Sequence, residues 1–291
     1  MKSIRPEDAG VRSFYQYMTS AIAPRPIALV STTDRSGNIN LSPFSFFNYV
    51  GIDPPIIVFA PNKRASDDSY KDTVLNLKEV PEAVVNLVDG NMVQQVSLAS
   101  SAYEKGINEF EKAGFTPVPS LAVAPPRVQE SPGHLECRVL EIKEIGSMSL
   151  VIAEVVLAHF SERILDSKGR IDMLKTRWAG RAGGDWYIAS GRESLFEVPR
   201  PAKGIGVDAL PLSVQRSAIL TGNELGILGS AAELPDQNDI RQYGYHALIA
   251  SFREQTQGAC ENFNELLHIR VKELLAEGNV KEALLAAFQS H

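Results

Sequence analysis

The sequence predicts a mainly β protein with α insertions, in which an antiparallel β-barrel spans residues 1–200 and a helical extension spans residues 201–291. Short apolar runs separated by turn residues indicate the barrel, and the long run that begins at Leu135 alternates apolar and polar residues with period two. From about Ser213 onward almost no strand pattern remains, and apolar residues recur at helical spacing instead. We therefore expect two domains that differ in secondary structure.

The N-terminal part is expected to form a helix and then a hairpin. An aromatic cluster within residues 1–20 predicts a short helix that packs on the core and ends at Pro24-Arg25-Pro26, because proline cannot continue a helix. The segment Asp34–Asn38 contains Asp, Ser, Gly and Asn, which favour a tight turn. Strands on both sides of this turn make residues 27–50 a predicted hairpin.

Two apolar runs, Phe44–Val50 and Ile56–Ala60, flank the break Asp53-Pro54-Pro55 and predict a strand, a turn and a second strand. The second run leads into a basic loop that is rich in hydroxyl groups. A helix is predicted over residues 66–80, because apolar residues recur at helical spacing there and Pro81 ends the pattern. The basic loop therefore lies between a strand and a helix start.

The remaining chain alternates predicted strands with predicted helices, and its strongest pattern is a long hairpin with a turn at Gly146-Ser147. Prolines make residues 115–126 an expected ordered loop. The strands expected here are 83–88, 135–145, 150–160, 163–165 and 186–188. The helices expected are 91–101 and 107–113 in the barrel region, and 240–255, 260–276 and 281–288 in the extension.

Composition and charge argue against several classes of protein. The net charge of −6 and the pI near 5.5 disfavour a nucleic-acid-binding protein, which usually carries a basic face. Cys137 and Cys260 lie far apart, so neither a disulfide framework nor a metal site is expected. No stretch approaches the ~18 apolar residues of a membrane span, and the N-terminus lacks the apolar core of a signal peptide. The sequence therefore predicts a cytoplasmic protein without nucleic-acid or membrane partners.

The stretch from Asn40 to Asn76 has the chemistry that a planar ligand with a phosphate tail requires. Small serines alternate with phenylalanines in its first half, and cations and hydroxyl groups precede the predicted helix in its second half. Apolar walls and backbone amides suit a flat ring, whereas cations, hydroxyl groups and a helix N-terminus suit a phosphate. Flavin mononucleotide (FMN) is thus the first candidate. The predicted cofactor-binding residues are Arg25, Asn40, Ser42, Pro43, Phe44, Ser45, Phe46, Lys63, Arg64, Ser66, Lys71, Asp72 and Thr73.

Each of these assignments competes with a simpler one. The cations and hydroxyl groups of residues 63–73 could bind the phosphate through charge-assisted hydrogen bonds, or form a solvated loop whose charge three aspartates offset and whose serine caps the helix. Ser42 and Ser45 could face the polar edge of the ring, or only the wet side of a half-buried strand whose phenylalanines belong to the core. Arg25 could offset negative charge near a reduced ring, or be a surface arginine. Residue spacing alone leaves these alternatives open.

Four stretches stand in a recognisable order along the chain. Pro24–Thr32, Asn40–Phe47 and Leu135–Cys137 are strand-like, and Lys71-Asp72-Thr73 is followed by Asn76. Together they resemble the flavin reductase-like family, the FMN-binding split-barrel flavoproteins, over about residues 10–200. The last stretch is similar to the family's Lys-Asp-Thr-x-x-Asn element, which opens the helix next to the phosphate. The resemblance implies a split-barrel homodimer with FMN in a groove near the subunit interface, and it favours the phosphate role of the basic loop.

The resemblance further implies exchange of hydride with NAD(P)H, or relay of electrons to another acceptor. We therefore expect an FMN-binding oxidoreductase of the flavin reductase type that acts on flavin or a small acceptor. The alternatives are an FMN-binding electron-transfer or sensing protein without NAD(P)H turnover, and a protein whose barrel only supports an interacting helical tail. No catalytic side chain is expected, because the flavin ring carries the chemistry. The segment Trp178–Tyr187, with Arg177 and Arg181, could admit the small-molecule substrate or form a plain Gly-rich turn.

Overall fold

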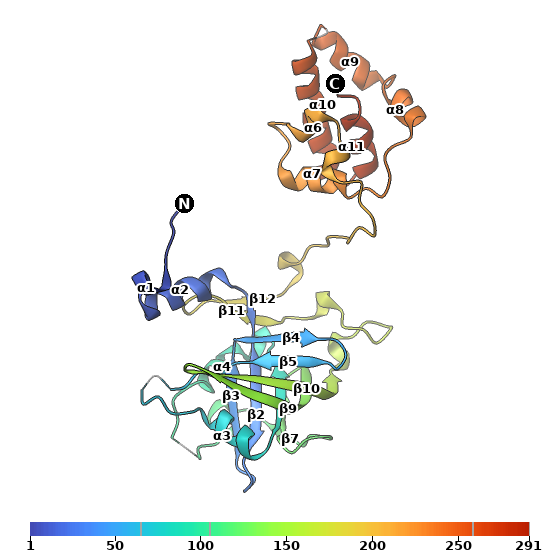
Figure 1. Ribbon diagram of the computed structural model, residues 1–291. Coiled ribbons are helices and arrows are strands. Elements are labelled where there is room, and N and C mark those ends of the chain that lie inside the picture. The colour runs from blue at the N-terminus through green and yellow to red at the C-terminus, as the bar shows by residue number, and fades with distance from the viewer. Residues whose placement is uncertain (65, 105, 258, 291) are drawn as a thin grey trace. The chain divides into compact units, whose positions relative to one another are not determined.

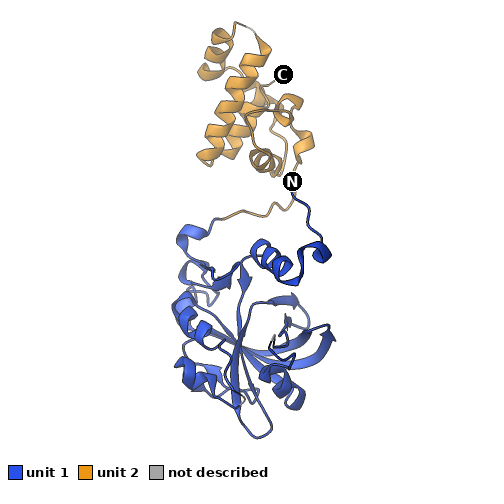
Figure 2. Ribbon diagram, turned by 90° about the vertical axis from the view of Figure 1, so that its left-hand side faces the viewer, with its two compact units in different colours: residues 1–196 blue, residues 197–291 orange. Residues whose placement is uncertain are grey.

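The computed structural model of the chain describes residues 1–64, 66–104, 106–257 and 259–290. The chain divides into two compact units, Met1–Phe196 and Glu197–His291, which Figure 2 shows in different colours. The first unit consists of antiparallel strands with inserted helices, and the elements described in the second unit are helices (Figure 1). This arrangement confirms the predicted fold class, an antiparallel split barrel followed by C-terminal helices.

The main sheet of the first unit has seven strands in the order β3-β2-β6-β9-β10-β5-β4, and all neighbouring pairs are antiparallel. β3 and β4 follow one another in the chain, yet they form the two edges of this sheet. Only Ser45 and Phe46 separate them, so the two edges approach within about 11 Å at this corner and the sheet curls into a split barrel. The strands are β2 Ala28–Thr33, β3 Ile39–Phe44, β4 Phe47–Gly51, β5 Ile56–Phe59, β6 Glu82–Leu87, β9 Gly133–Ile145 and β10 Met148–Phe160.

Smaller sheets and short helices complete the first unit. A three-stranded sheet in the order β1-β11-β12 joins the N-terminal segment to residues far along the chain, and β7 pairs with β8. These strands are β1 Arg25–Pro26, β7 Pro117–Val118, β8 Arg127–Val128, β11 Ala179–Arg181 and β12 Tyr187–Ala189. The helices are α1 Pro6–Ala9, α2 Val11–Ala21, α3 Asp72–Glu79, α4 Val93–Leu98 and α5 Glu109–Ala113, with 3₁₀ turns η1 Gly90–Met92, η2 Glu162–Ile164, η3 Met173–Lys175 and η4 Arg192–Ser194.

The two-residue period of β2 and β3 divides the buried side chains between two cores. Ala28 and Val30 of β2 face the barrel interior, where they pack with Phe59 and other apolar residues. Leu29 and Leu41 face the other way and belong to a second core, to which α4 and α5 contribute apolar residues. The outer face of β3 therefore lies under α4 and α5.

Two predicted elements near the site differ from the structure. Residues 27–50 do not form one hairpin, because the chain leaves β3 after Phe44 and crosses to the opposite edge of the sheet. The helix predicted over residues 66–80 begins only at Asp72. The residues before it form a turn in which the Asp67 carboxylate accepts hydrogen bonds from the N–H and the hydroxyl group of Ser69.

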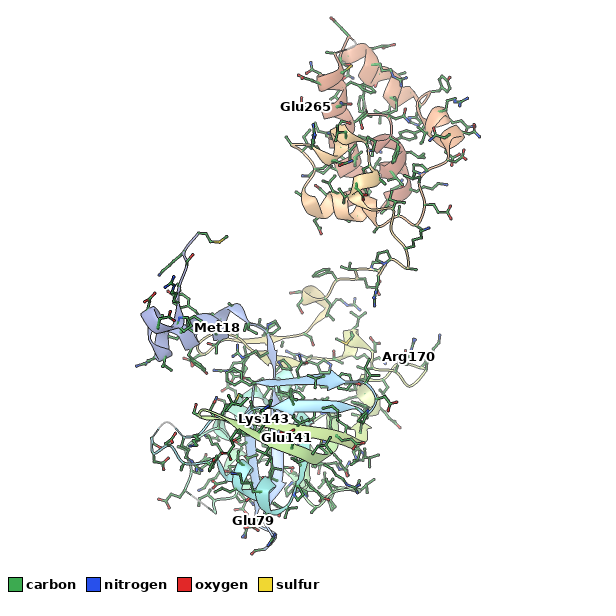
Figure 3. The ribbon with its side chains drawn as sticks, in the orientation of Figure 1. Met18, Glu79, Glu141, Lys143, Arg170 and Glu265 are labelled. Carbon is green, nitrogen blue, oxygen red and sulfur yellow. The ribbon has the colours of Figure 1, made fainter. Side chains whose placement is uncertain are left out.

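Three further predictions need correction. The N-terminal helix exists as α1 and α2, but Tyr15 and Met18 of α2 are exposed instead of packing on the core (Figure 3 labels Met18). The strand predicted at 163–165 overlaps the 3₁₀ turn η2. The helix predicted over 240–255 is two helices, since α8 ends at Tyr243 and the His246 side chain caps the start of the next helix.

The second unit has an apolar core of its own. Leu274 of α10 packs with Leu228 of α7 and Ala283 of α11, and Thr221 and Glu224 form a capping box at the start of α7. The helices are α6 Leu212–Gln215, α7 Gly222–Gly229, α8 Gln237–Tyr243, α9 Ala247–Gln255, α10 Cys260–Ala276 and α11 Val280–Ala287, preceded by the 3₁₀ turn η5 Val207–Ala209. Within the described residues, no helix combines the length and the apolar character that crossing a membrane requires.

Candidate functional site

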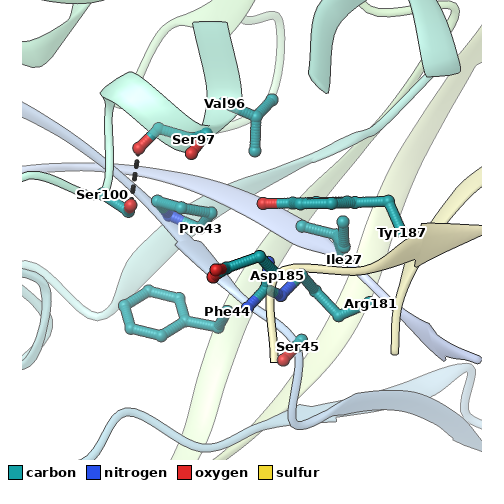
Figure 4. Close-up of a pocket in the computed structure, with 10 residues that line it drawn as sticks. All are labelled: Ile27, Pro43, Phe44, Ser45, Val96, Ser97, Ser100, Arg181, Asp185 and Tyr187. Atoms are coloured by element: carbon teal, nitrogen blue, oxygen red, sulfur yellow. Dashed lines mark hydrogen bonds between the residues drawn. The ribbon is translucent and has the colours of Figure 1, made fainter. Parts of the chain in front are cut away.

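A cavity of about 300 Å³ lies where three segments far apart in the sequence meet (Figure 4). The segments are the end of β3, the helix α4 with the residues after it, and the β11–β12 hairpin. Both the size and the mixture of apolar and polar groups are typical of sites for small organic ligands. The lining residues are Ile27, Pro43, Phe44, Ser45, Val96, Ser97, Ser100, Arg181, Asp185 and Tyr187.

β3 presents its end to this cavity because it is an edge strand. Pro43 has no N–H to donate, which a sheet tolerates at its edge, and within the sheet it pairs only with Leu29. Phe44 also lines the cavity, but its side chain is only 8% exposed and its ring stacks on Phe59 with centroids 5.8 Å apart. The structure thus favours a core role for Phe44 and leaves Pro43 and Ser45 to face a ligand.

The cavity adjoins a narrower polar end, and Ser100 lines both. Ser42, Ser100 and Ser101 bring hydroxyl groups to this end, which also includes Lys71 and the start of α3. The first N–H groups of α3 have no acceptor within the helix, so the helix start favours an anion. Lys71 forms no ion pair with any residue that the structure describes.

The basic loop is partly neutralised by its own carboxylates. Arg64 lines the polar end, yet its Nη2 lies 2.7 Å from the carboxylate of Asp72 and its Nη1 donates to the carbonyl oxygen of Tyr70 at 2.6 Å. Lys63 pairs instead with Asp68 at 3.1 Å. Neither Lys63 nor Ser66 lines the cavity or its polar end. Lys71 is therefore the lysine best placed for an anionic group, and Arg64 mainly braces the loop.

Arg25 joins the end of α2 to the residue that follows β11. Its guanidinium is buried and donates to the carbonyl oxygens of Thr19 and Ile22 at the end of α2, and to that of Ala182 after β11. Burial lowers the pKa of Arg25, and the nearby charge of Arg181 lowers it further. Arg25 does not itself line the cavity, whereas Arg181 does. The role predicted for Arg25 near a ring therefore stays a prediction, and Arg181 is the cation inside the cavity.

Several lining residues escaped the sequence reasoning. Ser97, Ser100 and Ser101 lie within the helix predicted over residues 91–101, and Glu109 lies within the helix predicted over residues 107–113; none of them was predicted to line a site. Asp185 and Tyr187 belong to the segment that could admit a substrate or form a plain Gly-rich turn, and both line the cavity at the end of β3. Among the described residues, no group of three His, Cys, Asp or Glu side chains could hold a metal ion.

The fold and the site together define a split-barrel protein. Its cavity and the adjoining polar end, together called the groove below, suit a planar ligand with an anionic tail. The model of the family described as "Flavin reductase like domain" matches residues 19–174. The chain thus belongs to the flavin reductase-like family, and so to the flavin-related oxidoreductases.

Similar proteins come from several bacteria. An uncharacterized protein of Aquifex aeolicus is 33% identical over 186 residues, which are 64% of this chain and 94% of that protein. The structure resembles nitrilotriacetate monooxygenase component B from Bacillus cereus, with a TM-score of 0.64 and 29% identity over 68% of this chain and 98% of that one. It also resembles 2-nitrobenzoate 2-nitroreductase NbaA from Pseudomonas fluorescens, with a TM-score of 0.63 and 31% identity over 70% of this chain and all of that one.

Proposed function

We propose that the protein is an FMN-binding oxidoreductase of the flavin reductase type, which takes electrons from NAD(P)H and passes them to flavin or a small acceptor. One observation carries the proposal: the cavity beside Pro43 and Ser45 adjoins, at Ser100, a polar end with Lys71 and a helix start. A flat ring in the cavity and a phosphate at the polar end would match the two chemistries. Family membership supports flavin as the ligand.

The residues present fit FMN. Ser42 and Ser101 can donate hydroxyl hydrogens to the ribityl chain or the phosphate, and Lys71 can add a charge-assisted hydrogen bond. The Ser100 hydroxyl group donates to the carbonyl oxygen of Ser97 at 2.6 Å and can offer a ligand its oxygen as an acceptor. The N–H groups at the start of α3 can do the same. When bound, FMN would supply a ring that accepts and releases two electrons and can carry negative charge in its reduced form.

The chain's own side chains would orient this ring and tune its surroundings. Pro43 and Tyr187 offer apolar surface on different segments of the cavity, and Arg181 brings positive charge to it (Figure 4). The Arg181 guanidinium is held in place because Nη2 donates to the carbonyl oxygen of Gly184 at 2.7 Å and the group lies 4.5 Å from the centroid of the Tyr187 ring. A fixed cation here would stabilise negative charge on a reduced ring.

We also propose that the protein is a homodimer whose interface lies near the groove. β4 is an edge strand with exposed apolar residues, namely Tyr49 and Val50, and Ile52 just after it is 86% exposed. A neighbouring apolar groove is lined by residues that include Phe47 and Leu135. Apolar surface of this kind favours contact with another protein surface. Sedimentation of the purified protein as a dimer would support this proposal, and a monomer at micromolar concentration would contradict it.

Cytoplasmic location stays a prediction of the sequence.

The visible absorption spectrum tests the proposed function. We expect flavin bands in the purified protein or after incubation with FMN, and loss of these bands when NADH or NADPH is added without oxygen. Bands that persist with both nucleotides would instead favour an electron carrier that another protein reduces. A protein that takes up no flavin would refute the assignment of the groove.

A further inference from the structure

A buried carboxylate lies at the polar end of the groove, where an anion binds under the proposed function. Glu109, at the start of α5, is only 8% exposed. Its Oε1 accepts a hydrogen bond from Nδ2 of Asn40 at 2.8 Å, and its Oε2 accepts one from the N–H of Leu41 at 2.9 Å. Both donors belong to β3, the strand that continues to the ring cavity. Glu109 therefore ties α5 to the strand on which the site is built.

The carboxylate also fixes the orientation of the Asn40 side chain. Because the amide nitrogen of Asn40 must face the acceptor-only carboxylate, its Oδ1 faces Thr73. The hydroxyl group of Thr73 donates to this Oδ1 at 2.8 Å, and both side chains are buried. Thr73 is the second residue of α3. A single relay, from Glu109 through Asn40 to Thr73, thus connects α5, β3 and the start of α3.

This relay assigns different parts to its members. The Thr73 hydroxyl hydrogen is already given to Asn40, so Thr73 would meet a phosphate with its backbone N–H. Glu109 lines the same polar end as Lys71, but an ionised carboxylate would repel a phosphate at close range. Burial raises the pKa of Glu109, while the N–H of Leu41 and the amide of Asn40 oppose that rise. Glu109 is therefore suited to position other groups and not to touch the ligand.

We infer that Glu109 is a positioning residue of the phosphate subsite, which holds Asn40 and Thr73 so that the start of α3 stays directed at the phosphate. The inference rests on the proposed function, since it assigns a role within that flavin site. It predicts that breaking the relay weakens the binding of a ligand only if that ligand carries the phosphate. Riboflavin has the same ring and ribityl chain as FMN but lacks the phosphate, so the two ligands separate these effects.

The test is the dissociation constant of each ligand, measured from the quenching of flavin fluorescence, for the full chain and its Glu109→Gln variant. Glutamine keeps the shape, but its NH₂ group must face one of two donors, Leu41 N–H or Asn40 Nδ2, and breaks the relay. We expect the FMN constant to rise about tenfold and the riboflavin constant to stay within about twofold. The control is Glu111→Gln, because Glu111 is exposed on the same helix, and this variant should alter neither dissociation constant.

A double variant keeps the inference testable if Glu109→Gln alone folds poorly. In Glu109→Gln with Asn40→Asp, the new amide can donate to the new carboxylate, which can still accept from Thr73, so the donors and acceptors match again. This variant should recover part of the lost preference for FMN, and no recovery would overturn the inference. Equal weakening of FMN and riboflavin would also overturn it while leaving the proposed function intact. A wild-type protein that binds neither ligand would overturn both.

Discussion

The two units of this protein use their polar side chains differently. In the first unit, Asn40, Thr73 and Glu109 are buried and bonded to one another beside a cavity. In the second unit, Thr221 and Glu224 cap the start of their own helix. The core cluster around Leu274 is apolar, and the buried Gln289 beside it donates to the backbone carbonyl oxygen of Ile240 at 2.7 Å. The family match at residues 19–174 falls entirely within the first unit. The difference teaches that buried polar side chains of the first unit join segments far apart in the chain, whereas the capping pair of the second unit acts within a single helix.

The largest effect should come from the core of the second unit. Leu274 is fully buried, so Leu274→Ala should lower the free energy of unfolding of this unit by about 2–5 kcal/mol. FMN affinity should not change, because the proposed site lies in the first unit. Scanning calorimetry with flavin titration checks both, and Leu212→Ala at an exposed position is the matched control. Loss of flavin binding in Leu274→Ala would show that the two units are coupled.

Acid should weaken the first unit through His134. Burial, with smaller contributions from Arg127 and His159, lowers the pKa of His134 from 6.5 to about 4. The unfolded chain then binds more protons between these values, so stability falls as the pH drops from 6.5 towards 4, by about 3 kcal/mol in total. His134→Gln can still donate to Asn86 and cannot titrate, so its unfolding free energy should depend less on pH in this window. Equal pH dependence in both proteins would contradict this assignment.

The next effect concerns the cation at the polar end. Lys71→Ala should weaken FMN binding by about 10- to 150-fold, as expected for the loss of a hydrogen bond to a charged group worth about 1.5–3 kcal/mol. Lys281→Ala, in the second unit, should leave the affinity unchanged and serves as the control. Fluorescence titration at low salt measures both constants. If Lys71→Ala binds FMN as tightly as the wild type, the phosphate lies elsewhere.

The smallest effect concerns the ring. Replacing Arg181 by glutamine removes positive charge from the cavity and should lower the two-electron potential of bound flavin by about 30 mV, equivalent to about 1.4 kcal/mol. Arg177→Gln is the control, because Arg177 is exposed and donates to Asn91 outside the cavity lining. Redox titrations with a reference dye measure the potential of bound flavin in the wild type and in both variants. Equal potentials in the two variants would remove Arg181 from the proposed role.

The predicted antiparallel barrel rested on short apolar runs between turn residues and on the period-two pattern of one long hairpin, and the resemblance to the family specified the split barrel. The long hairpin, seen as β9 and β10, follows directly from alternation and a two-residue turn. The corner at Ser45 and Phe46 was missed, since residues 44–50 contain neither glycine nor proline and their mostly apolar run is typical of a single strand. Likewise, the start of α3 at Asp72 depends on side-chain bonds within a turn, which helical spacing cannot reveal.

For the site, the sequence indicated the right stretch but not its contacts. Ser42, Pro43, Ser45 and Lys71 line the groove as the local chemistry suggested. The sequence left two roles open for Lys63, binding of the phosphate or pairing with an aspartate of the loop. In the structure it pairs with Asp68. Glu109 could not be singled out, because its partners lie almost seventy residues away and no local pattern connects them. Long-range polar contacts are the part that sequence spacing leaves undetermined.

A crystal structure of the protein with FMN tests the central claim most directly. We expect the ring in the cavity beside Pro43, Ser45 and Arg181, with the phosphate within hydrogen-bond distance of Lys71 and of the first N–H groups of α3. A ring in that cavity with its phosphate pointing away from α3 would contradict the phosphate assignment. FMN bound anywhere in the second unit would contradict the distinction between the two units.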